Sequence, residues 1–146
     1  MGFASARGLG HEPFPMKPLP LLLHVARIAD AILFWPALAL VIWGELSSSS
    51  EGLLFRYFGA INDKVLHFLS YFLLGAMVGA ALKSRRPVIW AVVGLICLGG
   101  LLEIVQSYVG RDMSFWDEMT NAAGAIGGAV IARIVVEPLR RRWAYK

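Results

Sequence analysis

Residues 88–110 read VIWAVVGLICLGGLLEIVQSYVG, and this run contains a single charged residue, Glu103. A bilayer core about 30 Å thick is crossed by roughly 20 helical residues. The run is therefore long enough and apolar enough to be a transmembrane helix. Because it is also rich in Gly and Leu and does not alternate apolar with polar residues, it indicates a helix and not a barrel strand.

Working outward from this run, the chain contains further apolar stretches of similar length. They are Leu19–Trp43, Val65–Leu82 and Met119–Val136. The sequence therefore predicts an all-α integral membrane fold with four transmembrane helices. We expect one transmembrane domain over residues 19–137, preceded by a tail at 1–18 and followed by a basic tail at 138–146.

The composition supports a membrane protein and argues against other classes. Of 146 residues, 58 % are hydrophobic and 16 % are charged, and the mean hydropathy is +0.63. An ordinary soluble domain has about 45–50 % apolar and about 25 % charged residues. The composition argues against a soluble enzyme, a disordered chain and a secreted domain built on disulfides, and the single Cys97 has no partner in the chain.

The Lys and Arg residues give the predicted orientation. Residues 1–18, 83–87 and 138–146 together carry nine of them, whereas the two other connecting segments, 44–64 and 109–118, carry three. Cytoplasmic segments of membrane proteins carry the excess of Lys and Arg. We therefore expect both termini in the cytoplasm. The net charge of +4 is interpreted as this orientation signal and as a contact with anionic lipid, not as a nucleic-acid interface.

Two shorter patterns predict local contacts within the membrane. Gly75-x-x-x-Gly79 and Gly124-x-x-x-Gly128 each place two small residues on one helix face, which permits close helix packing in lipid. Arg27 and Asp30 are three residues apart in the first span, and this spacing predicts a local ion pair.

Polar residues gather at the ends of the spans that this topology places outside the cytoplasm. They are Asp63, Lys64, His67 and Tyr71 on the second span, Glu103 and Gln106 on the third, Arg111 in the following loop, and Asp117 and Asn121 at the start of the fourth. The spacings of three and four residues put the members of each helix on one face. If these faces meet, they form one polar pocket open to the outer surface.

Glu103 is the most informative residue of this set. About 22 Å of helix separate it from Val88 at 1.5 Å per residue, so it lies within the hydrocarbon or at its outer edge. An ionisable side chain at such a depth faces a partner or a water-filled cavity. We expect its partner to be His67, Lys64 or Arg111.

The same residues resemble the VanZ-like family. The resemblance is carried by Asp63-Lys64-x-x-His67-x-x-x-Tyr71, then Glu103-x-x-Gln106, then Gly110-Arg111-Asp112-x-Ser114-x-x-Asp117-x-x-x-Asn121-x-x-Gly124. It covers residues 60–130, about half of the chain. It implies a small multi-pass protein of the bacterial cytoplasmic membrane. For the founding member of the family it implies reduced sensitivity to the glycopeptide teicoplanin, and it supplies no established reaction.

The leading functional hypothesis is binding of an anionic lipid headgroup or of a lipid-linked cell-envelope precursor at the outer leaflet, with a possible effect on glycopeptide sensitivity. Lys64, His67 and Arg111 would contact phosphate or another anion. Glu103, Asp117 and Asn121 would orient these cations and bind hydroxyl or amide groups.

Two alternatives remain open. The site is an enzyme if His67 acts as a general base oriented by Asp63 or Glu103, while Arg111 stabilises negative charge. It is purely structural if its groups only pair with one another across helices, for example His67 with Glu103. Asp63, His67 and Glu103 are possible metal ligands, but one His without a nearby Cys leads us to predict no metal and no cofactor.

Overall fold

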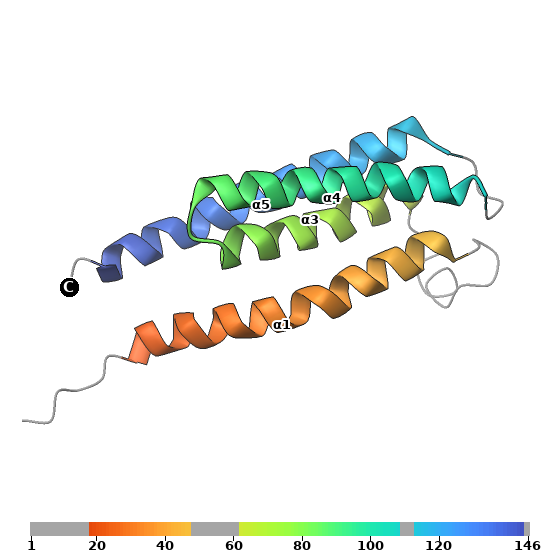
Figure 1. The fold of residues 1–146 in the computed structure, drawn as a ribbon. Coiled ribbons are helices and arrows are strands. Elements are labelled where there is room, and N and C mark those ends of the chain that lie inside the picture. Colours follow the sequence, from red (N-terminus) through yellow and green to blue (C-terminus); the bar gives the residue numbers. More distant parts are fainter. Residues whose placement is uncertain (1–17, 48–61, 109–112, 145–146) are drawn as a thin grey trace, which may run out of the picture.

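The computed structural model describes residues 18–47, 62–108 and 113–144, and throughout these ranges the regular structure is helical. The helices are α1 (Pro18–Leu46), α3 (Asp63–Ala81), α4 (Arg85–Gln106) and α5 (Phe115–Ala144) (Figure 1). All four are long and apolar enough to cross a membrane. The prediction of an all-helical fold with four helices of this kind is confirmed, and it indicates a multi-pass membrane protein.

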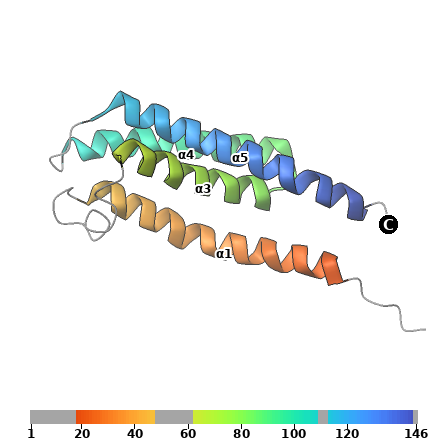
Figure 2. The ribbon, with the colours of Figure 1, turned by 180° about the vertical axis from the view of Figure 1, so that it is seen from behind.

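Successive helices run in opposite directions, so the bundle has two distinct ends (Figures 1 and 2). At one end, α1 and α4 finish and α3 and α5 begin. We call it the carboxylate end because it contains Glu45, Asp63, Glu103 and Asp117. At the opposite end, α1 and α4 begin and α3 finishes. We call it the arginine end, after Arg27, Arg133 and Arg140.

The two helices in closest contact are α3 and α5, which pack through glycines. The glycines concerned are Gly75, Gly79, Gly124 and Gly128. A Cβ at Gly79 would lie 2.6 Å from the backbone oxygen of Ala129, and a Cβ at Gly128 would collide with the backbone oxygen of Phe72. Only glycine permits this approach of one backbone to the other. The predicted contacts of the two small-residue motifs are confirmed.

The apolar core lies between α3, α4 and α5. It consists of Tyr71, Leu74, Val78, Val88, Val92, Leu95, Ala125 and Ala129. Helix α1 rests on this core through the partly buried Phe34, Leu38 and Val41. Many large apolar side chains point outward instead, Trp35 and Trp90 among them. Such a surface suits lipid because hydrocarbon, unlike water, does not disfavour exposed apolar side chains.

Helix α5 is longer than the sequence suggested. It continues through Pro138 to Ala144, so most of the segment expected to be a basic tail is helical. Glu137 pairs with Arg133 at 3.2 Å and with Arg141 at 3.3 Å, each four residues away. Such pairs support a helix after its apolar run has ended.

Candidate functional site

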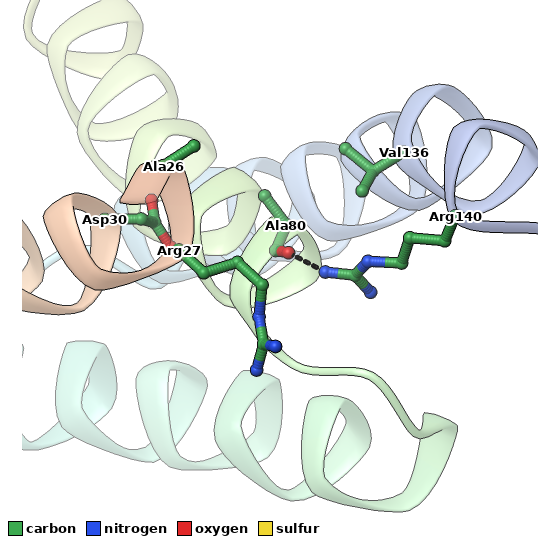
Figure 3. Close-up of a pocket in the computed structure, with 6 residues that line it drawn as sticks. All are labelled: Ala26, Arg27, Asp30, Ala80, Val136 and Arg140. Atoms are coloured by element: carbon green, nitrogen blue, oxygen red, sulfur yellow. Dashed lines mark hydrogen bonds between the residues drawn. The ribbon is translucent and has the colours of Figure 1, made fainter. Parts of the chain in front are cut away.

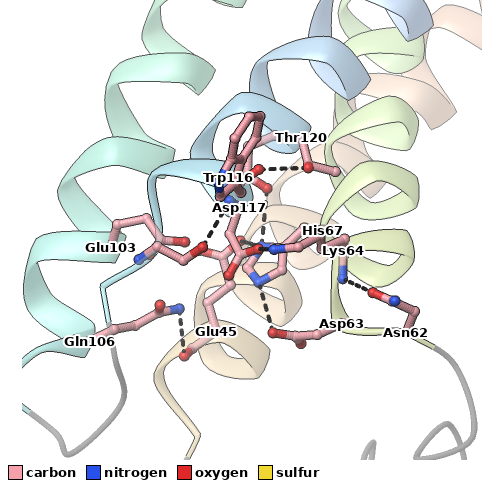
Figure 4. A network of polar contacts seen from close by, with 12 residues as sticks. Glu45, Asn62, Asp63, Lys64, His67, Glu103, Gln106, Trp116, Asp117 and Thr120 are labelled. Carbon is pink, nitrogen blue, oxygen red and sulfur yellow. Dashed lines mark hydrogen bonds and ion pairs between the residues drawn. The ribbon is translucent and has the colours of Figure 1, made fainter.

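A cluster of polar side chains occupies the carboxylate end, and all four helices contribute to it (Figure 4). Six of its members are at least nine-tenths buried: Glu45, His67, Glu103, Gln106, Asp117 and Asn121. Asp63, Lys64, Tyr71 and Glu118 complete what we call the polar cluster. Burial of so many polar groups is costly unless they find partners, so their contacts decide what the cluster can do.

The start of α3 is set by a side-chain cap. The Asn62 side chain accepts a hydrogen bond of 3.0 Å from the backbone N–H of Lys64. This bond satisfies one of the free N–H groups at a helix start. The helix then begins at Asp63, and Asp63 and His67 stand on one face, as the spacing predicted.

His67 lies between acceptors on both sides of its ring. Its Nδ1 is 3.1 Å from Oδ1 of Asn121 and 3.4 Å from Oε1 of Glu45. Its Nε2 is 3.7 Å from Oδ2 of Asp63. The imidazole therefore links α3 to both α1 and α5, and carboxylates stand near both of its nitrogens.

Lys64 forms the second link between α3 and α5. Its Nζ donates to Oδ1 of Asp117 at 2.5 Å. The Asp117 side chain is 13 % exposed, whereas that of Lys64 is 50 % exposed. The ammonium group thus stands at the rim of the cluster, and part of it is accessible from outside.

Glu103 has a different partner from those expected. Its Oε2 accepts a hydrogen bond of 3.0 Å from the backbone N–H of Ser114, at the start of α5. Neither His67 nor Lys64, two of the three partners expected for Glu103, forms an ion pair with it among the described residues, and the backbone of Ser114 takes one carboxylate oxygen instead. Arg111, the third expected partner, lies outside the described residues, and so does the Gly110-Arg111-Asp112 part of the family motif.

Gln106 holds the end of α1. Its Nε2 donates to the backbone oxygen of Glu45 at 3.0 Å. Sequence reasoning did not select Glu45, although the residue is buried beside His67. The available signal was its position: it is the first acidic residue after the apolar run that ends at Trp43. Glu118, which follows Asp117 in the sequence, was also not among the predicted pocket residues.

Several buried atoms of the polar cluster make no hydrogen bond of 3.5 Å or less among the described residues, although Glu118 stands close to Asn121 and Tyr71 close to Glu45. These atoms are the Tyr71 hydroxyl, Oε1 of Glu103, Oε2 of Glu118 and Nδ2 of Asn121. Three of them converge on Gly99. A Cβ there would lie 2.6 Å from Oε2 of Glu118, 3.1 Å from Nδ2 of Asn121 and 3.2 Å from the Tyr71 hydroxyl. Buried polar groups in proteins are rarely left unpaired.

One set of residues has the donor types of a metal site. Ligand atoms of Asp63, His67 and Asp117 all lie within 4.8 Å of one another. One imidazole and two carboxylates suit a divalent transition metal. However, the Lys64 ammonium is already 2.5 Å from Asp117, so a metal ion would compete with it. Glu103, which sequence reasoning placed in such a set, does not belong to this group.

Comparison of the chain with protein-family models, with curated proteins and with solved structures gives no match. The resemblance to the VanZ-like family therefore stays a prediction that rests on the motif. The chemistry of the polar cluster is the basis on which a function can be inferred.

Proposed function

We propose that this protein binds the headgroup of a membrane lipid, or of a lipid-linked cell-envelope precursor, at the carboxylate end. The observation that carries the proposal is the set of buried polar atoms in the polar cluster that make no close hydrogen bond. A purely structural cluster is expected to pair its groups internally, because an unsatisfied buried group costs about 1–3 kcal/mol. A bound headgroup would supply partners to such atoms, and it reaches the three beside Gly99 only if the side chains around them move apart.

The charges of the polar cluster favour a particular kind of headgroup. The polar cluster contains two cations, Lys64 and, when protonated, His67. It contains five carboxylates, those of Glu45, Asp63, Glu103, Asp117 and Glu118. The half-exposed ammonium of Lys64 suits a phosphate. The carboxylate oxygens suit hydroxyl, amide or ammonium donors. We therefore propose a headgroup that combines a phosphate with such donors, and Arg111 is the second cation that the sequence offers to the phosphate.

The orientation of the protein decides which leaflet supplies the lipid. The excess of Lys and Arg in the segments at the arginine end supports a cytoplasmic location for that end and for both termini. The polar cluster would then face the outer leaflet. With the VanZ-like resemblance, this supports a place in the bacterial cytoplasmic membrane, a lipid-linked envelope precursor as ligand, and an effect on glycopeptide sensitivity.

The test is native mass spectrometry of the detergent-purified protein with the lipids that copurify. We expect wild type to retain a discrete lipid species that Lys64→Met loses. Lys83→Met, a matched control at the arginine end, keeps it. Glu103→Gln, which preserves size and an acceptor for Ser114, also weakens retention. Equal retention by Lys64→Met, Glu103→Gln and wild type would contradict the proposal, provided that thermal unfolding shows each variant folded.

The second candidate is an enzyme acting on the same lipid, and the surroundings of His67 favour it. Asn121 and Glu45 hold Nδ1, and Nε2 faces Asp63. Carboxylates at both nitrogens favour the protonated imidazole, which can donate a proton to a leaving oxygen of the lipid. If this candidate is right, the lipid changes mass on incubation with wild type. His67→Gln then retains the lipid and leaves its mass unchanged.

A further inference from the structure

At the arginine end, the last carbonyl groups of α3 are bonded by arginines from two other helices. Arg27 of α1 donates its Nε to the backbone oxygen of Ala81 at 3.0 Å. Arg140 of α5 donates its Nη1 to the backbone oxygen of Leu82 at 3.1 Å and its Nη2 to that of Ala80, which leaves its Nε without a partner among the described residues. Carbonyls at a helix C-terminus lack intrahelical partners and carry partial negative charge. These bonds therefore fix the position of both guanidinium groups.

Some N–H groups of the Arg27 guanidinium remain available to a ligand. A guanidinium group carries five N–H donors, and Arg27 uses only its Nε within the described ranges 18–47, 62–108 and 113–144. Its two terminal nitrogens have no hydrogen-bond partner there. Since a guanidinium group is always charged, the remaining N–H groups suit an anion.

Asp30 stands one helical turn away from Arg27, and one of its carboxylate oxygens lacks a partner. Its Oδ2 is buried and accepts no hydrogen bond from the described residues. The predicted ion pair with Arg27 does not form, because Arg27 reaches the end of α3 instead. A buried carboxylate oxygen in this state is costly, and a hydrogen-bond donor would relieve the cost.

A cavity of about 240 Å³ lies between these groups (Figure 3). It is lined by Ala26, Arg27 and Asp30 of α1, Ala80 of α3, and Val136 and Arg140 of α5. Ligand pockets for drug-sized molecules measure about 300–1,000 Å³. This cavity is smaller, so it suits a headgroup and not a whole lipid.

We infer that the cavity binds the headgroup of a phospholipid from the leaflet at the arginine end. The phosphate bonds to the guanidinium groups of Arg27 and Arg140. A headgroup donor, the ammonium of ethanolamine or a hydroxyl of glycerol, bonds to Asp30. This site is separate from the polar cluster and does not depend on the function proposed for it.

A membrane lipid fits better than a free phosphate for two reasons. The cavity has apolar walls at Ala26, Ala80 and Val136, and exposed apolar side chains such as Ile28 and Val135 continue beside it along α1 and α5. Acyl chains can pack along those faces. Basic pockets between transmembrane helices are also a recurrent way of binding anionic headgroups.

The experiment measures binding of short-chain phospholipids to the detergent-purified protein by native mass spectrometry. The Lys64→Met background is included so that the carboxylate end does not contribute. We expect one phosphatidylethanolamine or phosphatidylglycerol to bind about tenfold more tightly than phosphatidylcholine, whose headgroup has no N–H or O–H donor. Equal affinity for all three lipids overturns the role of Asp30.

The variants test separately the binding of the phosphate and the binding of the headgroup's hydrogen-bond donor. Asp30→Asn, which keeps the size of the side chain, removes the preference over phosphatidylcholine. Arg27→Gln weakens the binding of all three lipids about tenfold, whereas the exposed control Arg85→Gln leaves their affinities unchanged. Unchanged binding in Arg27→Gln overturns the site. Inorganic phosphate that competes as strongly as the lipids overturns the assignment to a lipid. The two sites are tested independently. Whether or not Lys64→Met loses the lipid at the carboxylate end, the results for Arg27→Gln and Asp30→Asn decide the site at the arginine end.

Discussion

The two ends of the bundle tie the same helices together by different chemistry. At the carboxylate end, side chains of different helices bond to one another, as in His67 with Asn121 and Lys64 with Asp117, and also to backbone groups, as in Gln106 with Glu45. At the arginine end, Arg27, Arg133 and Arg140 bond to backbone oxygens of residues 80–83. The first arrangement needs particular residues on several helices. The second needs only a cation near the end of a helix.

This difference implies different tolerance to substitution. Water reaches the edge of a membrane and can replace an arginine at an exposed carbonyl. It does not easily replace a partner within the polar cluster, where six residues are at least nine-tenths buried. Changes at the carboxylate end should therefore cost more stability than comparable changes at the arginine end.

The largest effect should come from Gly128→Leu, which removes the packing that brings both ends together. Any Cβ at this position collides with the backbone oxygen of Phe72. Because the backbone cannot move aside as a side chain can, we expect a loss of about 3 kcal/mol or more, measured by unfolding in detergent. Gly94→Leu is the matched control, since nothing lies within 4 Å of a Cβ there. Similar losses in both variants would contradict the packing described for α3 and α5.

Asn121→Ala should have the next largest effect on stability, and it removes contacts at the carboxylate end only. It removes the acceptor 3.1 Å from Nδ1 of His67 at a fully buried position. We expect a loss of about 1–3 kcal/mol in unfolding free energy. Thr120→Ala, the neighbouring control, removes a hydroxyl whose hydrogen bond is exposed and should change the free energy much less. The comparison fails if the two variants are equally stable.

Arg140→Ala tests the arginine end at the corresponding place. It removes bonds to the backbone oxygens of Ala80 and Leu82. Hydrogen bonds between membrane helices average about 0.6 kcal/mol and reach about 1.7 kcal/mol, so we expect a loss in this range. Thermal unfolding should therefore rank Arg140→Ala above the exposed control Arg142→Ala and below Asn121→Ala in the size of the loss. A greater loss than in Asn121→Ala would reverse the comparison.

Glu137→Gln should have the smallest effect. Its pairs with Arg133 and Arg141 lie within one helix, and the Glu137 side chain is one-third exposed. Pairs of this kind contribute about 0.3–0.5 kcal/mol. The change should shorten the helical C-terminus of α5, which hydrogen exchange at residues 138–144 would detect, while the Tm stays nearly the same. A large drop in Tm would mean that this end of α5 does more for the fold than its contacts suggest.

The polar residues were predictable as a group but not in their pairing. Helical spacing placed Asp63 with His67 and Asp117 with Asn121, because a helix turns by a fixed angle per residue. Spacing carries no information about which helix lies opposite. The bond of Glu103 to the backbone of Ser114 was therefore not predicted, and Glu45 was missed although it lies 3.4 Å from His67.

The sequence by itself determined the class of fold. Four long apolar runs leave few alternatives to four membrane helices, because lipid requires every backbone group to be bonded within its own segment. It also determined where α3 and α5 pack, since glycines four residues apart permit an approach that other residues block. Only the tertiary structure decided the two sites. The rotation and depth of each helix against its neighbours decide which buried atoms lack a partner and which arginines surround a cavity. Small shifts in packing change the rotation and the depth.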